Sequence, residues 1–252
     1  TGSVGTGAVV GNAGAAGSAG ATGACSTIFA PDADGRTPIF VAANGADANV
    51  GTEDAPLATV AAALALAVQI APKRAHLYVA EGIYDGAIEL PDVANLVIEG
   101  GYKRAGNTWT RTCEATAREL VVLTDKNAGD NAPVVTAKGG VKGTSLVRLT
   151  IKTKDQGKKG ELGKNGETLI AVSVRGSGTT LTLDDVAILV GKGGDGGEGT
   201  PGAAPPVAAC DGAADCETGA NGDDGKDGAP AAAGAFGEDG YTAGVGATGM
   251  AG

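Results

Sequence analysis

Aromatic and basic side chains are scarce in this chain of 252 residues. Aromatic residues make up 3% of the sequence, and 19 Lys and Arg stand against 29 Asp and Glu, which gives a net charge of −10. Nucleic-acid binding needs clustered basic side chains, and single-strand binding also needs aromatic stacking platforms. The composition therefore disfavours a nucleic-acid partner and indicates an acidic, soluble protein.

Long apolar runs are also missing. The longest uncharged run outside the glycine-rich N-terminal tract, residues 55–72, is rich in alanine and is bounded by Asp54 and Lys73. A spanning helix needs about 20 predominantly apolar residues, so we predict no transmembrane segment. No basic and apolar leader follows Thr1, and we expect that any signal peptide has been removed or lies outside this sequence.

Histidine occurs once and cysteine four times, as Cys25, Cys113, Cys210 and Cys216. No Cys-x-x-Cys pair exists and one histidine completes no zinc set, which favours disulfides in an oxidising compartment over free thiols. Four cysteines allow three pairings. The short intervening loop favours Cys210–Cys216, which leaves Cys25–Cys113. We therefore expect an extracellular or cell-surface protein.

Glycine, with 45 residues, recurs at every third position in four tracts. The shorter inner tracts hold Gly157, Gly160, Gly163 and Gly166, then Gly193, Gly196, Gly199 and Gly202. The two outer tracts, which we predict to be the assembly residues, hold Gly2, Gly5, Gly11, Gly14, Gly17, Gly20 and Gly23, then Gly219, Gly222, Gly225, Gly228, Gly234, Gly237, Gly240, Gly246, Gly249 and Gly252.

A period of three matches the left-handed extended helix with three residues per turn, in which every third residue lies on one edge. Glycine on that edge lets backbones approach closely, as in a three-chain collagen helix or a bundle of polyglycine II helices. Collagen carries roughly 15–20% Pro or hydroxyproline, whereas residues 219–252 contain only Pro230. The bundle is therefore the preferred prediction, with a disordered glycine-rich linker as the alternative.

Short β-type runs separated by turns fill the centre of the chain. Their spacing of about 20 residues is typical of a solenoid. A segment with Val60, Leu64 and Val68 at helical spacing precedes the second run, with Asp54 as its expected N-cap, and would close one end of the solenoid. The runs are residues 39–41, 77–79, 96–98, 120–123, 134–135, 146–151, 169–174 and 181–190.

Part of this pattern resembles a known family. The stretches that carry the resemblance are residues 40–45 (FVAANG), 49–52 (NVGT), 55–60 (APLATV), 77–84 (LYVAEGIY), 98–102 (IEGGY) and 109–111 (WTR). They are similar to the start of extracellular right-handed parallel β-helix domains of the pectin-lyase-like type. The Gly-x-x tracts separately resemble the polyglycine II bundle of the snow flea antifreeze protein.

The resemblance to pectin-lyase-like domains raises the question of catalysis. Asp184-Asp185 is similar to the paired carboxylates of polygalacturonases. The His and Arg-x-Lys motifs that accompany these carboxylates are missing from the sequence. We therefore expect both residues on the outside and at the turn of one coil of the β-helix. His76 alone is expected to be a surface or cap residue. Three groups of Asp and Asn residues are partial matches to a calcium site. The alternative is that they are ordinary turn residues. The groups are Asp32 and Asp34; Asp125, Asn127 and Asp130; and Asn221, Asp223, Asp224 and Asp227.

We interpret the chain as an all-β protein: a short right-handed parallel β-helix over residues 37–190, with an N-terminal capping helix and a Gly-x-x insertion at 155–167. A Gly-x-x tract at 1–25 and a linker at 26–36 precede it, and a polyglycine II-type bundle at 191–252, with a turn loop at 203–218, follows. Five lysines in and just before the insertion are expected to form a solvated loop or an electrostatic partner for the acidic residues between 223 and 239: Lys152, Lys154, Lys158, Lys159 and Lys164.

The expected function is noncatalytic and without a cofactor: an extracellular structural or adhesive protein that assembles with itself, as a fibre subunit joined through its Gly-x-x tracts. The alternative is an ice- or glycan-binding protein that uses a flat face of small residues between positions 15 and 22. A polysaccharide-active enzyme is the third and least favoured hypothesis.

Overall fold

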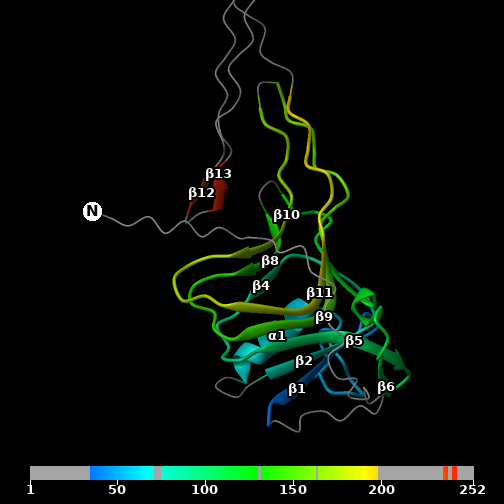
Figure 1. Ribbon diagram of the computed structural model, residues 1–252. Coiled ribbons are helices and arrows are strands. Elements are labelled where there is room, and N and C mark those ends of the chain that lie inside the picture. Colours follow the sequence, from blue (N-terminus) through cyan, green and yellow to red (C-terminus); the bar gives the residue numbers. More distant parts are fainter. Residues whose placement is uncertain are drawn as a thin grey trace, which may run out of the picture.

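In the computed structural model the described part of the chain is mainly β, with parallel strands that curl around a common core (Figure 1). The structure describes residues 35–70, 75–129, 132–162 and 164–197, together with the backbone of residues 235–237 and 240–242. The predicted tract at 1–25, most of the linker at 26–36 and the turn loop at 203–218 lie outside these residues.

The largest sheet is a stack of parallel strands. In spatial order the stack is β1 (Thr37–Val41), β2 (Ala75–Ala80), β5 (Val97–Ala105), β9 (Thr144–Lys152) and β11 (Leu181–Leu189). The second half of β9 also pairs in parallel with β7 (Val121–Thr124), which in turn pairs with β3 (Gly82–Asp85). A hairpin strand, β6 (Thr108–Arg111), runs antiparallel to β5.

A second parallel sheet closes another side of the core. It is formed by β4 (Ile88–Leu90), β8 (Pro133–Ala137) and β10 (Ile170–Val174). Strands that follow each other along the chain, such as β2, β3 and β4, therefore lie on different sides. Each circuit of the chain adds one layer to the stack. A separate antiparallel hairpin is formed by β12 (Ala235–Gly237) and β13 (Gly240–Thr242).

Long strands bend at a column of left-handed residues. Gly101 has φ 84°, Arg148 φ 53° and Asp185 φ 50°. Because Val147 pairs with both Glu99 and Asp184, these bends lie at neighbouring positions in successive layers. A Cβ on Gly101 would lie 2.6 Å from Cδ of Arg148. Glycine is thus required where the Arg148 stem crosses the bend.

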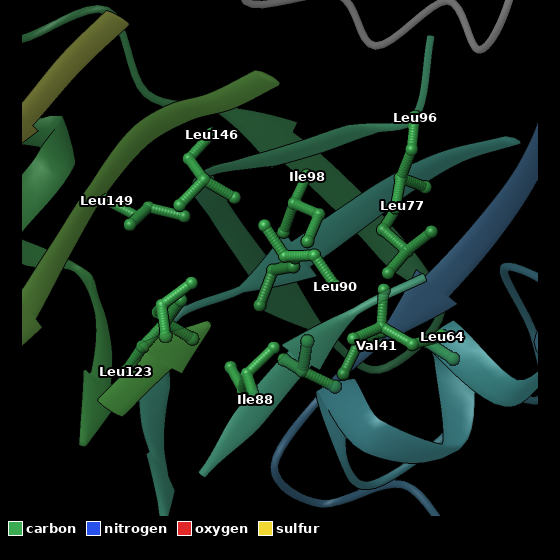
Figure 2. Close-up of a cluster of buried hydrophobic side chains, with 14 of the residues drawn as sticks. Val41, Leu64, Leu77, Ile88, Leu90, Leu96, Ile98, Leu123, Leu146 and Leu149 are labelled. Atoms are coloured by element: carbon green, nitrogen blue, oxygen red, sulfur yellow. The ribbon is translucent and has the colours of Figure 1, made fainter. Parts of the chain in front are cut away.

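Aliphatic side chains from every layer fill the interior (Figure 2). Leu77, Ile98 and Leu146 occupy matched positions in β2, β5 and β9 and are fully buried. Figure 2 shows Ile88, Leu90 and Leu123 pointing at them from the other sides. Burial of each such side chain contributes roughly 1.5–3 kcal/mol, so the hydrophobic effect drives the curling of the sheets around one core.

The described residues contain one α-helix, α1 (Val60–Gln69), and a short 3-10 helix, η1 (Ala117–Glu119). α1 packs against β1, β2 and β4 at the first layer. The expectation that Asp54 caps it is wrong, because Thr59 is the N-cap and accepts the N–H of Ala62. Leu57 instead pairs with Val41 beside β1, which keeps residues before the helix extended. Val68, expected to be buried, is 51% exposed.

Candidate functional site

Three glycine-rich backbone segments, residues 155–161, 164–167 and 191–197, lie side by side beyond the sheets. Figure 1 shows them rising away from β9, β10 and β11. The first and third run parallel and are hydrogen-bonded to each other, continuing the pairing of β9 with β11, and the second runs back beside both of them. Backbone hydrogen bonds of 2.8–2.9 Å join them, from Gly157 to Lys192, Gly160 to Asp195, Gly194 to Glu167, Gly197 to Lys164, and Glu167 to Lys158.

These hydrogen bonds have two regular features. Donors in one segment are three residues apart, as in Gly157 and Gly160 or Gly194 and Gly197. Five of the six backbone hydrogen bonds between segments run around the group in one direction, each segment donating to one neighbour and accepting from the other. The sixth, from the N–H of Lys192 to the carbonyl oxygen of Asp155 where the segments leave the sheet, runs the opposite way. In a flat sheet, by contrast, a strand bonds on two opposite edges. We call the three segments the glycine cluster.

Glycine is required on the inner side of the cluster. A Cβ on any inner glycine would lie under 3.0 Å from backbone atoms of a neighbouring segment, closer than real Cβ atoms approach. None of these glycines has a left-handed φ, so the reason is space and not conformation. The inner glycines are Gly157, Gly160, Gly166, Gly191, Gly194 and Gly197.

The expected glycine register is right for one inner tract and wrong for the other. Gly157, Gly160 and Gly166 face the neighbouring backbones, as predicted. In the later tract, the period of three predicts that Gly193 and Gly196 face the neighbouring backbones. A Cβ on Gly196 would instead have no atom within 4 Å, so this position points away from them. The inner positions belong to Gly191, Gly194 and Gly197, because the pairing of β9 with β11 fixes which residues enter the cluster. The sequence carries both stripes and does not distinguish them.

A buried ion pair joins the glycine cluster to the sheets. The Glu167 carboxylate accepts from the Lys154 ammonium and from the backbone N–H of Lys158 at 2.6 Å. Lys154 also donates to the carbonyl oxygen of Ala128 at 3.0 Å. The hydrogen bond from Lys154 lowers the pKa of Glu167, and the N–H of Lys158 lowers it further. Side-chain exposure is 15% for Lys154 and 5% for Glu167.

The remaining predicted assembly glycines are mostly outside the described residues. This holds for the whole tract from Gly2 to Gly23 and for the tract from Gly219 to Gly252, apart from two positions. Gly237 and Gly240 lie opposite each other in the antiparallel β12–β13 hairpin, so the expectation of one extended tract through these two glycines is wrong, because the chain reverses direction between them. The acidic residues expected to attract the lysines of the insertion also lie outside the described residues. Within the described part, Lys152 pairs with Asp155 and Lys154 with Glu167.

Cys113 is disulfide-bonded. It follows Thr112, whose N–H donates to the carbonyl oxygen of Gly101 at 2.8 Å and so fixes this stretch beside β5. The other three candidate cysteines, Cys25, Cys210 and Cys216, lie outside the described residues.

A second group of side chains lies on the outer side of β1, β2 and β5. Phe40, Tyr78, Tyr102 and Trp109 form a separate apolar cluster, with Phe40 5.5 Å from Tyr78 and 5.1 Å from Trp109 between ring centroids. Trp109 donates its indole N–H to the carbonyl oxygen of Glu53 at 3.1 Å. The β5–β6 hairpin and the loop before α1 therefore cover this face of the sheet.

Beside these rings, Glu99 lies between His76 and Arg111. Its carboxylate oxygens are 3.0 Å from Nε2 of His76 and 2.9 Å from a guanidinium nitrogen of Arg111. Burial alone would raise the pKa of Glu99, but the hydrogen bond from His76 and the charge of Arg111 together hold it below its ordinary value. His76 is 12% exposed and stacks on Tyr78 at 4.0 Å. The expectation of a surface or cap histidine is therefore wrong.

The carboxylate pair Asp184-Asp185 lies on β11, as expected for the outside and turn of a layer. Asp185 occupies the left-handed bend and binds Arg118 at 2.8 Å, with Arg148 at 3.9 Å. The Asp185 carboxylate thus lies between two guanidinium groups at the bend and partly offsets their positive charge.

Among the described residues, no group of three or more His, Cys, Asp or Glu side chains could hold a metal ion. The candidate calcium residues Asp32, Asp34, Asp130, Asn221, Asp223, Asp224 and Asp227 lie outside that part of the chain. Asp125 accepts the N–H of Asn127 at 3.0 Å in a local turn. Within the same residues, no helix combines the length and apolarity needed to cross a membrane.

Comparison of the chain with protein family models, with curated proteins and with solved structures finds no match. The functional interpretation therefore depends on the geometry of the chain itself.

Proposed function

We propose that the protein is a noncatalytic extracellular structural or adhesive protein, built as a right-handed parallel β-helix that carries a polyglycine II-type bundle. One observation carries the proposal: the glycine cluster is joined by backbone hydrogen bonds at three-residue steps, five of six in one direction around it, and its six inner glycines leave no room for a Cβ. A backbone of three residues per turn supports this pattern.

The cluster supports self-assembly because its recognition is through backbone atoms. Any extended Gly-x-x segment offers the same N–H and C=O spacing, whether it comes from the same molecule or from a second one. The sequence holds two further Gly-x-x tracts, at 1–25 and at 219–252, the second of which is interrupted by the β12–β13 hairpin. We propose that these tracts add to the glycine cluster of a neighbouring molecule and so build a fibre.

Other features support an extracellular setting. Cys113 is disulfide-bonded, and disulfides persist in oxidising compartments. Catalysis is not needed to explain Asp185 or His76, because Asp185 pairs with Arg118 and His76 with Glu99.

Light scattering of the oxidised full chain over a concentration series tests the proposal. Open-ended growth of mass with concentration is the expected result, and it should be lost when residues 1–23 are deleted. The matched control is the full chain with Gly196→Ala, because that position has open space around it. A concentration-independent monomer, or undiminished polymers after the deletion, would contradict self-assembly through these tracts.

A further inference from the structure

The last layer of the stack leaves apolar side chains uncovered among the described residues. Leu183 is 40% exposed and Ile188 45%, although they align with the fully buried Leu146 and Ile151 of the layer before. Leu189 beside them is 51% exposed. Aliphatic side chains also line a hollow of about 450 Å³ between β10 and β11. The core therefore ends here without a cover, whereas α1 packs over the first layer.

The edge of this layer lacks the residues that normally keep a strand edge from pairing. β11 pairs with β9 on one side, and no other described strand pairs with it. Lysine and proline are common protectors of exposed edges. Residues 169–190 contain neither, whereas the preceding layer, residues 133–152, contains three lysines and a proline. The last layer thus has the composition of an interior layer, and we expect it to be covered.

β11 consists of two arms that meet at a left-handed bend. Asp185, at the bend, has φ 50°. Leu181 and Leu183 in the first arm face the core, and so do Val186 and Ile188 in the second arm, because each aligns with a fully buried residue of β9. The inward positions therefore change from odd to even residue numbers at the bend.

This change makes the strand complementary to itself. Directly opposite residues of an antiparallel pair share one face, so an odd residue of one arm must lie opposite an even residue of the other arm. A register with Leu183 opposite Ile188 of a second copy meets this condition along both arms. The same register places Leu181 opposite Val190, which lines the hollow.

We propose that two copies of the chain join end to end about a twofold axis through the bend at Asp185. The first arm of β11 in one copy then pairs antiparallel with the second arm in the other. Since β10 forms the remaining side of the layer, the axis also brings it antiparallel to the partner's β10. Head-to-tail stacking is not available, because α1 packs over the first layer and Leu57 pairs beside β1. The result is a closed dimer, which does not depend on the proposed assembly through Gly-x-x tracts.

The charges on β11 favour this register over its neighbours. Asp184 lies opposite the partner's Ala187, so no like charges are directly opposed. Asp185 lies near the axis but is paired with Arg118 at 2.8 Å, and Arg148 is 3.9 Å away. A shift by two residues in one direction would oppose Asp184 to the partner's Asp185, and like charges destabilise a strand pair. A shift in the other direction shortens the overlap of the two strands.

The end layer is large enough for a stable interface. It comprises residues 169–190, about 22 residues per copy, and stable interfaces contain roughly 20–30 residues a side. Its centre is aliphatic and its few charges lie at the bend and in the turn after β10. An apolar centre of this kind is typical of interfaces between identical subunits.

Photo-crosslinking of the full chain tests the dimer. Benzoylphenylalanine in place of Leu189, which lies opposite the partner's Thr182 in the proposed register, should crosslink to a peptide containing residues 181–184. In a mixture of isotope-labelled and unlabelled chains, the crosslinked pairs should include one chain of each kind. The control position is Ile83 on β3, which is 61% exposed at the side of the stack and should give no such crosslink. Crosslinks only within one chain, crosslinks to a Gly-x-x tract, or none at all would overturn the proposal.

Charge substitutions at one opposed pair test the register. Ala187→Asp should lower the yield of the crosslinked dimer at least about fivefold, because it opposes a carboxylate to Asp184 twice in each dimer. Adding Asp184→Lys to that variant should restore the yield, since each opposed pair then holds opposite charges. Trp109 fluorescence reports that the fold of each variant is intact. An unchanged yield with Ala187→Asp, or equal losses in the single and double variants, would contradict this register.

Discussion

The backbone N–H of Gly194 donates to the carbonyl oxygen of Glu167 at 2.8 Å, and a Cβ on Gly194 would lie 2.6 Å from the backbone nitrogen of that same residue. Gly194 and Glu167 are therefore joined by a backbone hydrogen bond at the same place where their backbones leave no room for a side chain. The bond holds the two segments together, and the missing side chain allows them to be close enough to form it. The glycine period of the sequence has a direct physical cause at this contact.

Gly194→Ala is expected to destabilise the glycine cluster by about 1–3 kcal/mol, the usual cost of forcing extra methyl groups into a packed site. Chemical denaturation and hydrogen exchange of residues 157–167 measure this effect. Gly196→Ala is the matched control, because nothing lies within 4 Å of its Cβ position. It should change stability by less than about 0.5 kcal/mol. Equal effects of both substitutions would contradict the close packing of the inner stripe.

Glu167→Gln is expected to lower the free energy of unfolding by about 1–3 kcal/mol, because it leaves the largely buried Lys154 ammonium without its carboxylate. Urea denaturation provides the measurement. Asp195→Asn serves as the control, since its pair with Lys192 is exposed on both sides and exposed pairs contribute roughly 0–1 kcal/mol. If the two substitutions cost the same, the Glu167–Lys154 pair does not anchor the cluster.

Acidification is expected to destabilise the apolar cluster on the outer side of β1, β2 and β5, because it protonates the adjacent Glu99 carboxylate. The folded protein holds the pKa of Glu99 below its ordinary value of 4.5, so the unfolded state takes up the proton first. The stabilisation is therefore complete above about pH 4.5 and is lost as the pH falls through the lower folded pKa.

Denaturation measured between about pH 3 and about pH 6, a range that extends roughly one unit or more on either side of the ordinary glutamate pKa, checks this effect. Glu99→Gln should flatten the slope. Glu89→Gln is the control, because Glu89 is exposed beside Lys138, and it should leave the slope unchanged. An unaltered slope in the Glu99 variant would refute the role of His76 and Arg111 in holding the charged carboxylate.

Non-reducing peptide mapping should find Cys113 linked to Cys25, and Cys210 linked to Cys216, as the cysteine spacing predicts. Reduction, or Cys113→Ser, is expected to cost about 2–4 kcal/mol through the freed unfolded chain. Thermal unfolding with and without reductant provides the second readout. A link from Cys113 to Cys210 or Cys216 would contradict the predicted pairing.

Much of the strand content could be predicted from the sequence because the core positions are aliphatic. The runs at 77–79 and 146–151, for example, correspond to β2 and β9. The apparent regular spacing was misleading, however, since it counts strands on different sides of the core. The residues stacked in one column, Leu77, Ile98, Leu146 and Leu183, are unevenly spaced along the chain.

Other features depend on tertiary contacts that no local pattern contains. β3 and β4 are short and carry charged residues, and only their pairing with β7 and β8 makes them strands. The environment of His76 depends on Glu99 and Arg111, which the fold brings from β5 and β6. Likewise, the choice of Gly191, Gly194 and Gly197 over Gly193 and Gly196 depends on the register between β9 and β11.

The most direct test of the account is amide hydrogen exchange, followed by NMR, at the donors of the glycine cluster. Gly157, Gly160, Glu167, Gly194 and Gly197 donate to backbone carbonyls of neighbouring segments, so their amides should exchange at least a hundredfold more slowly than an open chain, as expected for a bundle that opens only with local unfolding. Cross-segment contacts between Gly157 and Lys192 should accompany this protection. Open-chain exchange at all five amides, with a protected core in β2, β5 and β9, would contradict the bundle.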